Sequence, residues 1–196
     1  MILARIFENQ SNGFYIDVGA HHPKRFSNTM YFYKQGWRGI NIDATPGSMK
    51  LFFKERKLDI NLEVAISDSN KTLTFHIFDE PALNTFSKDL AKEYINSNHK
   101  LIEKFEIRTR SLESVLDEYM LFSQKISFLS IDVEGLDFEV IKSNNWEKYR
   151  PQVILLEFQK FDIENFLKSD NYKFMQDSGY RFFGKTYNTV FFENVN

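Results

Sequence analysis

The chain of 196 residues contains no cysteine. This absence excludes disulfide bridges, thiolate zinc sites and a cysteine nucleophile, and it fits a reducing compartment. Long apolar runs are also missing, since none approaches the roughly 18 residues of a membrane-spanning helix. The amino end, MILARIFENQSN, is too short in its apolar part and becomes acidic too early to match a signal peptide. We therefore expect a cytoplasmic protein without a membrane span.

Charge of one sign is scarce as well. The chain has 25 Lys and Arg against 27 Asp and Glu, which gives a net charge of −2 at pH 7. Proteins that bind nucleic acid usually concentrate positive charge on one face, and this sequence has no basic stripe. We expect no nucleic-acid partner. The length fits one domain with a sizeable core, and the sequence leaves the oligomeric state open.

Buried strands alternate with helices along most of the chain. Short apolar runs predict strands at residues 14–18, 39–43, 62–66, 127–133 and 153–158, and helical spacing predicts helices at 26–35, 45–57 and 138–143 and around Leu112, Val115, Leu116 and Tyr119. Residues 179–194 are typical of an antiparallel hairpin. This order indicates a mostly parallel α/β sheet in a single domain that covers residues 1–196.

The middle of the chain departs from this order. Residues 72–78 alternate apolar and polar side chains, as in a strand with one wet face, and residues 88–96 predict a helix. We expect residues 69–105, here called the insertion, to face the substrate. His76 and His99 lie in this region and are expected at the surface.

Acidic residues stand where the predicted parallel strands end, and ligands bind beyond those ends in an open parallel sheet. These residues are Asp17, Asp43, Asp68, Asp132 with Glu134, and Glu157. Gly19 lets the backbone turn sharply and approach a ligand, because it has no Cβ. Asp43 follows Gly19 by 24 positions, near the roughly 20-residue offset at which an acid binds ribose hydroxyls. The pattern predicts a nucleoside site.

The turn itself, DVGAHHP, keeps one of the three glycines of the dinucleotide fingerprint, so a pyrophosphate would find a poor cradle. A ligand without phosphates fits better, and an aspartate two residues before the glycine suits an amino or sulfonium cation, as in S-adenosylmethionine. A nicotinamide-dependent oxidoreductase and a non-catalytic S-adenosylmethionine-binding module stay open as alternatives.

The stretch SIDVEG brings Ser130, Asp132 and Glu134 to one side of an extended segment. Two carboxylates at a common site favour proton uptake, so that one can act as a general base. Alternatively, a divalent cation such as Mg²⁺ sits between them, or one caps the following helix and the other meets solvent. His21 and His22 border the turn but point apart, which argues against a metal site there.

Two stretches, YIDVGAHHPKRFSNTMYFYKQGWRGINIDATP and FLSIDVEGLDFEVIKSNNWEKYRPQVILLE, with VAISD between them, resemble the FkbM-type S-adenosylmethionine-dependent methyltransferases. The similarity runs over residues 13–158, and I-D-V-E-G is its most family-specific part. The resemblance implies a class I methyltransferase (Rossmann-like) fold. Such a fold has a mostly parallel seven-stranded sheet with the last strand antiparallel and helices on both faces.

The resemblance also implies the cofactor contacts. The methionine part lies against Asp17, Gly19 and Ala20, the ribose against Asp43, and the adenine near Ser67 or Asp68; the remaining cofactor-binding positions are His21, Asn28 and Ala44. Many members have asparagine after D-V-G-A and E-P-x-P after the second strand, where this chain has His21 and DATP. Aspartate keeps the carboxylate for the ribose, whereas the histidine leaves the role of its position open.

Members of this family typically methylate hydroxyls, often on sugars of bacterial surface polysaccharides or on natural products. The resemblance therefore implies an O-methyltransferase with a glycan or small-molecule acceptor, acting in polysaccharide or glycoconjugate biosynthesis. The acceptor hydroxyl must lose its proton as the bond to the methyl group forms, so a base is expected nearby. Asp132 or Glu134 is the first choice and His22 the second, and Mg²⁺ at Asp132 and Glu134 is the alternative.

Overall fold

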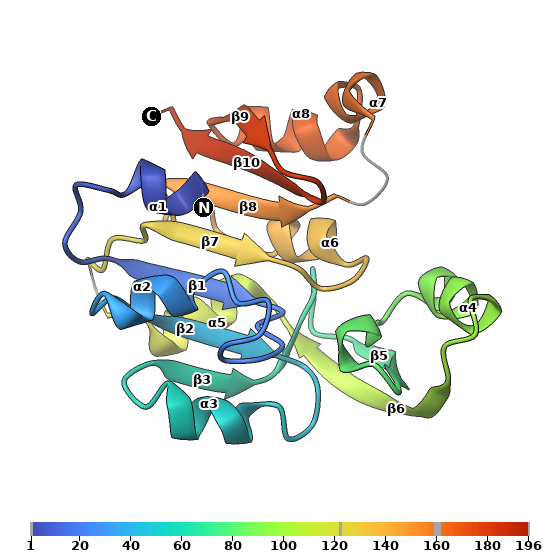
Figure 1. Cartoon of the computed structure of the whole chain (residues 1–196). Helices are drawn as coiled ribbons and strands as arrows, with labels where there is room; N and C mark the ends of the chain where they lie inside the picture. The colour runs from blue at the N-terminus through green and yellow to red at the C-terminus, as the bar shows by residue number, and fades with distance from the viewer. Residues whose placement is uncertain (1, 122, 159–161, 196) are drawn as a thin grey trace.

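The computed structural model describes residues 2–121, 123–158 and 162–195. Its main sheet has the strand order β3-β2-β1-β7-β8-β10-β9 (Figure 1). These strands are β1 (Phe14–Val18), β2 (Arg38–Asp43), β3 (Ile60–Glu63), β7 (Phe128–Ile131), β8 (Val153–Glu157), β9 (Tyr180–Lys185) and β10 (Thr189–Asn194). The pairs from β3 to β8 are parallel, and β10 is antiparallel to both of its neighbours. The predicted class I methyltransferase fold is confirmed.

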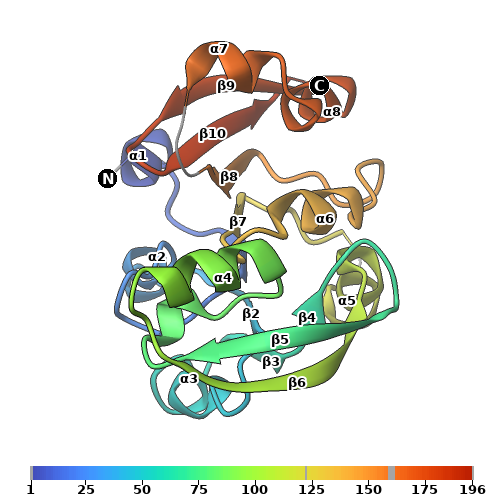
Figure 2. The same cartoon turned by 90° about the vertical axis from the view of Figure 1, so that its right-hand side faces the viewer.

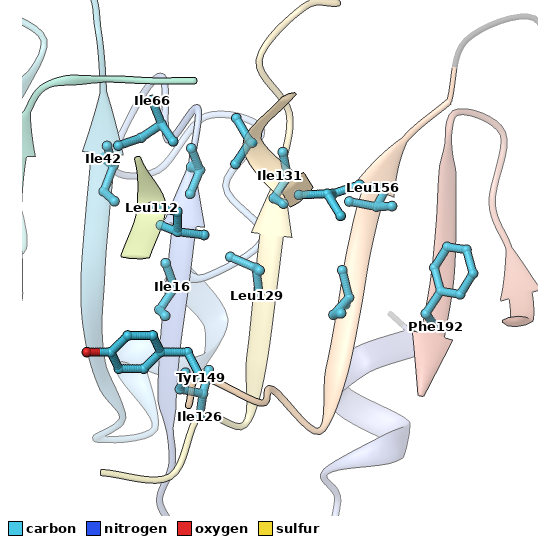
Figure 3. Close-up of a cluster of buried hydrophobic side chains, with 14 of the residues drawn as sticks. Ile16, Ile42, Ile66, Leu112, Ile126, Leu129, Ile131, Tyr149, Leu156 and Phe192 are labelled. Carbon is cyan, nitrogen blue, oxygen red and sulfur yellow. The ribbon is translucent and has the colours of Figure 1, made fainter. Parts of the chain in front are cut away.

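Helices cover both faces of this sheet because its central strands are apolar on both sides. Ile16 and Leu129 share a buried cluster with Leu112 of α5 (Leu112–Tyr119) (Figure 3). The same cluster includes side chains of α6 (Asp137–Lys142), α7 (Ile163–Leu167) and α8 (Asp170–Asp177). Tyr15 and Phe128 point the other way, toward α1 (Ile2–Ile6) and α2 (Met30–Lys34). Among the described residues, no helix is long and apolar enough to cross a membrane.

The strand order fixes where a ligand can enter. From β1 the chain moves outward to β2 and β3, and it then returns to place β7 on the other side of β1. Strand order therefore reverses between β1 and β7, and the loops that follow these two strands diverge at the carboxyl edge of the sheet.

Three predicted element boundaries were wrong near this edge. Helix α2 begins at Met30 and not at residue 26, because residues 19–28 form a loop in which His21 and Phe26 have positive φ angles. Helix α3 (Met49–Glu55) likewise begins after a turn over residues 45–48. The predicted strand 62–66 divides into β3 and β4 (Ala65–Ile66), which belong to different sheets. Helices α1, α7 and α8 were not predicted.

The insertion contributes most of a second sheet, with the strand order β4-β6-β5. Strand β5 (Thr72–Phe78) and helix α4 (Lys88–Asn96) have the predicted bounds, and η1 (Pro81–Leu83) lies between them. Strand β6 (Leu101–Arg110) begins in the insertion and continues past residue 105, its expected end. Figure 2 looks onto the carboxyl edge of the main sheet and shows β5, β6 and α4 in front of that edge. The surface position predicted for His76 was wrong: the residue is 4% exposed, and its ring nitrogen Nδ1 lies 3.2 Å from the carbonyl oxygen of Thr85, which pairs with this end of β5.

Candidate active site

A cavity of about 250 Å³ lies at the carboxyl ends of β1, β2 and β7. The strands of the main sheet and the loops that follow them line the cavity with residues 17–21, 26–28, 42–45, 130 and 132–134. The second sheet and the insertion cover the cavity with further side chains. The structure thus brings together nine of the predicted site residues: Asp17, Gly19, Ala20, His21, Asn28, Asp43, Ala44, Asp132 and Glu134. The cavity has a polar end beside β1 and β7 and an apolar end beside β2 and β3.

Position 19 must be glycine because the loops that follow β1 and β7 approach each other closely there. Its φ is +84°, and a Cβ at this position would lie 1.7 Å from the Asp132 carbonyl oxygen. The amides of Gly19 and Ala20 both donate to the Ile42 carbonyl, at 2.9 and 3.0 Å. The sequence suggested that this glycine permits close approach of a ligand, whereas here the nearest obstacle is the backbone that follows β7.

Asp43 joins the loops that follow β1 and β2. One carboxylate oxygen accepts the His21 amide and the other accepts the Thr45 amide, each at 2.8 Å. A carboxylate offers roughly four acceptor positions, so Asp43 keeps capacity for ribose hydroxyls while it orders both loops. The first bond also holds His21 in its left-handed conformation, with φ at 52°.

Asp17 is the buried acid of the polar end, with 5% of its surface exposed. Its carboxylate accepts the Thr29 hydroxyl at 3.1 Å, and the Asn28 amide donates to Ser130 Oγ at 3.1 Å. Burial raises the pKa of Asp17 to about 6, although the Thr29 hydroxyl and the Arg56 charge act in the opposite direction. A cation bound at this end would stabilise the ionised carboxylate.

Asp132, Glu134 and Glu157 form an acidic cluster beside the polar end. Each offers a carboxylate oxygen within 4.8 Å of the others. Loss of hydration among the surrounding groups raises the pKa of Asp132 well above its ordinary value, and the charges of Glu157 and Glu134 raise this pKa further. The surface of Asp132 stays accessible from the cavity. Such a cluster can accept a proton or hold a hard cation.

The loop that carries this acidic cluster is held from two directions. Glu134 has a φ of 50°, its carbonyl accepts the Thr85 hydroxyl at 2.6 Å, and its carboxylate accepts the Tyr94 hydroxyl at 2.7 Å. Asp137 accepts the amides of Val133 and Gly135, each at 3.3 Å. Burial, followed by the charge of Asp132, raises the pKa of Asp137 to about 7. These contacts fix the loop between β7 and α6.

Residues beside the polar end and at the apolar end of the cavity were not predicted as site residues. Glu157 was noted at a strand end but not assigned to the site; because β8 neighbours β7, its carboxylate meets that of Asp132. The apolar end is lined by Val64, Ile66, Phe75 and Phe86. Alternation within residues 72–78 marks Phe75 as buried, but no local signal tells that the insertion folds over the sheet edge.

The chain matches the family model described as the Methyltransferase FkbM domain over residues 17–182. It belongs to the FkbM methyltransferase family. The protein is therefore an S-adenosylmethionine-dependent methyltransferase, which decides against the nicotinamide-dependent alternative. No curated protein matches the chain.

Two solved structures are similar to this methyltransferase. One is the Methanococcus jannaschii fibrillarin pre-rRNA processing protein, with a TM-score of 0.48 and 11% identity over 94% of this chain and 67% of that chain. The other is precorrin-6y C5,15-methyltransferase from Geobacter metallireducens GS-15, with a TM-score of 0.44 and 13% identity over 97% of this chain and 84% of that chain.

Three predicted site residues of this methyltransferase lie outside the cavity. His22 Nδ1 accepts the amides of Lys24 and Arg25, at 3.1 and 2.9 Å, and so caps its own loop. Ser67 is fully buried, and the carboxylate of Asp68 is paired with Lys71 at 2.7 Å. Ser67 and Asp68 follow β4, which pairs with β6 of the second sheet. The base role expected of His22 and the adenine contacts expected of Ser67 and Asp68 thus stay predictions, made for residues that do not line the cavity.

Proposed function

We propose that this methyltransferase transfers the methyl group of S-adenosylmethionine to a hydroxyl of a sugar in a bacterial surface polysaccharide or glycoconjugate. The observation that carries the proposal is the two-ended cavity with an acidic cluster beside it. Its polar end contains a buried carboxylate, Asp43 stands in the middle, and its apolar end is lined by Val64 and Phe75. The cofactor has a charged amino acid, a ribose and a flat base in the same order, so the residues present fit it.

In this proposal Asp17 binds the ammonium group of the cofactor, with Asn28 beside it, and Asp43 binds the ribose hydroxyls. Gly19, Ala20, His21 and Ala44 form the turns that surround the ribose. The cofactor, when bound, supplies an electrophilic methyl group on a sulfonium sulfur. The protein supplies mainly alignment, which contributes up to about 7 to 11 kcal/mol toward the barrier when the geometry is good.

The acceptor hydroxyl gives its proton to the Asp132 and Glu134 pair. A base works best when its pKa is near the working pH, and loss of hydration, followed by the charges of Glu157 and Glu134, raises the pKa of Asp132 in that direction. The alternative occupant of the acidic cluster is Mg²⁺, for which three carboxylates are suitable ligands. EDTA distinguishes the two: it leaves methyl transfer unchanged if the carboxylates act as the base, and it abolishes transfer without unfolding the protein if they hold the metal.

The chemistry around the acidic cluster also limits the acceptor. Three carboxylates repel phosphate groups, and the whole chain has a net charge of −2. A neutral, hydroxyl-rich acceptor is therefore favoured over nucleic acid. A panel with tritium-labelled S-adenosylmethionine should label neutral glycosides and oligosaccharides and leave RNA unlabelled. Labelling of RNA alone would contradict the sugar acceptor, and no labelling together with tight cofactor binding would favour a non-catalytic binding module.

Titration calorimetry with S-adenosylhomocysteine tests the cofactor assignment. Asp43→Ala should weaken binding by about tenfold to a hundredfold, since hydrogen bonds to a charged group are lost. Glu134→Gln should bind normally and abolish transfer to the accepted sugar. Asp68→Ala, which removes an acid at a strand end outside the cavity, is the matched control. Equal affinity for Asp43→Ala and wild type would sink the ribose assignment.

A further inference from the structure

The apolar end of the cavity is built in large part by the insertion. Phe75 of β5 and Phe86, two residues before α4, pack with ring centroids 4.5 Å apart and an interplanar angle of 38°. Both rings line the cavity. Phe105 of β6 contacts Phe75 edge-on at 5.9 Å but does not line it. Two aromatic side chains of one segment thus share a single cavity surface.

Strands β2 and β4 and the link between β3 and β4 contribute aliphatic side chains to the same end. Ile42, Val64 and Ile66 line the cavity beside the aromatic pair, and no described residue that carries charge lines this end apart from Asp43. A surface that combines aliphatic and aromatic side chains accommodates a flat ligand ring with polar atoms at its edge.

Side-chain hydrogen bonds fix the insertion against the main sheet at this point. The Asn84 amide donates to Thr45 Oγ1 at 3.2 Å, and its carbonyl oxygen accepts the Phe78 amide at 2.9 Å. Thr85 and His76 exchange two backbone hydrogen bonds, at 2.9 and 3.1 Å. The aromatic pair is therefore held in place next to the loop that follows β2.

We propose that Phe75 and Phe86 bind the adenine base of the cofactor, so that the insertion is part of the cofactor site. This inference rests on the proposed function, because it assigns one part of the same ligand. The resemblance implies an adenine contact for Ser67 or Asp68, which do not line the cavity, whereas Phe75 and Phe86 do line it. A ring stacked on a base contributes enough that its removal weakens binding by roughly fivefold to a hundredfold.

The experiment is calorimetry with two probes, S-adenosylhomocysteine and methylthioadenosine, which has the adenosine part without the amino acid. Phe86→Ala should weaken both probes by the same factor, about tenfold. Phe105→Ala is the matched control, since Phe105 is also half-buried and also packs against Phe75; it should leave both affinities unchanged. Asp17→Asn should weaken S-adenosylhomocysteine only.

The outcomes separate the inference from the proposed function. If wild type binds both probes and Phe86→Ala binds them equally well, the adenine assignment is wrong and the cofactor proposal stands. Equal losses in Phe86→Ala and Phe105→Ala would mean that the insertion acts only through its folding, which also overturns the assignment. If wild type binds neither probe, the proposed function itself fails. A circular dichroism melting curve for each variant shows that it is folded before it is titrated.

Discussion

At the scale of single residues, the raised pKa of Asp17 predicts how cofactor binding depends on pH. In the proposed cofactor site, ionised Asp17 pairs with the ammonium group, and burial raises the pKa of Asp17 to about 6. Below this pH the carboxyl binds a proton that must leave when the cofactor binds. The affinity for S-adenosylhomocysteine should therefore fall by about tenfold between pH 7 and pH 5, because roughly one Asp17 in eleven is ionised at pH 5.

Two controls isolate Asp17 from the other acids of the site. Methylthioadenosine has no ammonium group, so its affinity should change much less over the same range. Asp17→Asn should bind S-adenosylhomocysteine weakly at both pH values. A wild-type affinity that is flat from pH 7 to pH 5 would contradict the pairing of Asp17 with the ammonium group.

At the scale of elements, α4 holds the loop that carries Glu134. The Tyr94 hydroxyl bonds the Glu134 carboxylate, and a Cβ on Gly135 would lie 2.8 Å from Leu90 Cδ1. This packing gives a physical reason for the glycine of the I-D-V-E-G stretch, whose φ is +98°. The insertion therefore reaches both the apolar end of the cavity and the acidic cluster.

Removing the Tyr94 hydroxyl should loosen this loop without changing the fold. A hydrogen bond to a charged group contributes about 1.5 to 3 kcal/mol, so Tyr94→Phe should speed amide exchange in residues 132–137 by about tenfold or more. Exchange in β8 should stay as in wild type. Tyr187→Phe, at a side chain that is 91% exposed, is the matched control. Unchanged exchange in residues 132–137 would show that α4 does not restrain the loop.

Elements with their own buried pattern could be predicted from the sequence, and those that depend on distant partners could not. Strands β1 and β8 can be recognised in the sequence as apolar runs, because both faces of each strand are buried. The division between β3 and β4 cannot be recognised, because it depends on pairing with Thr109 and Arg110 of β6, which lie more than 40 positions further on. Ser67 and Asp68, for which the resemblance implies an adenine contact, follow β4 and therefore lie in a part of the chain that the second sheet positions.

At the scale of the whole molecule, one buried ion pair joins the main sheet to the loop that shapes the cavity. Arg56 and Asp59 are both fully buried and lie 2.9 Å apart. Arg56 also donates to the Tyr15 hydroxyl of β1, to Thr29 Oγ1 and to the Pro23 carbonyl. Since the Thr29 hydroxyl bonds Asp17, this network connects the folded core to the polar end of the cavity.

Breaking this pair should therefore destabilise the protein as a whole. Asp59→Asn leaves the Arg56 charge buried without its carboxylate, which costs about 3 to 5 kcal/mol, a large part of the 5 to 15 kcal/mol typical of a domain. Asp89→Asn is the matched control, because Asp89 pairs with Lys92 at the same three-residue spacing but is 93% exposed; its loss should cost at most about 1 kcal/mol. Urea unfolding followed by tryptophan fluorescence measures the stability of both variants, since Trp37 is buried in the core between the main sheet and helices α1 and α2. Equal midpoints for the two variants would mean that the Arg56 network orders the loop without stabilising the fold.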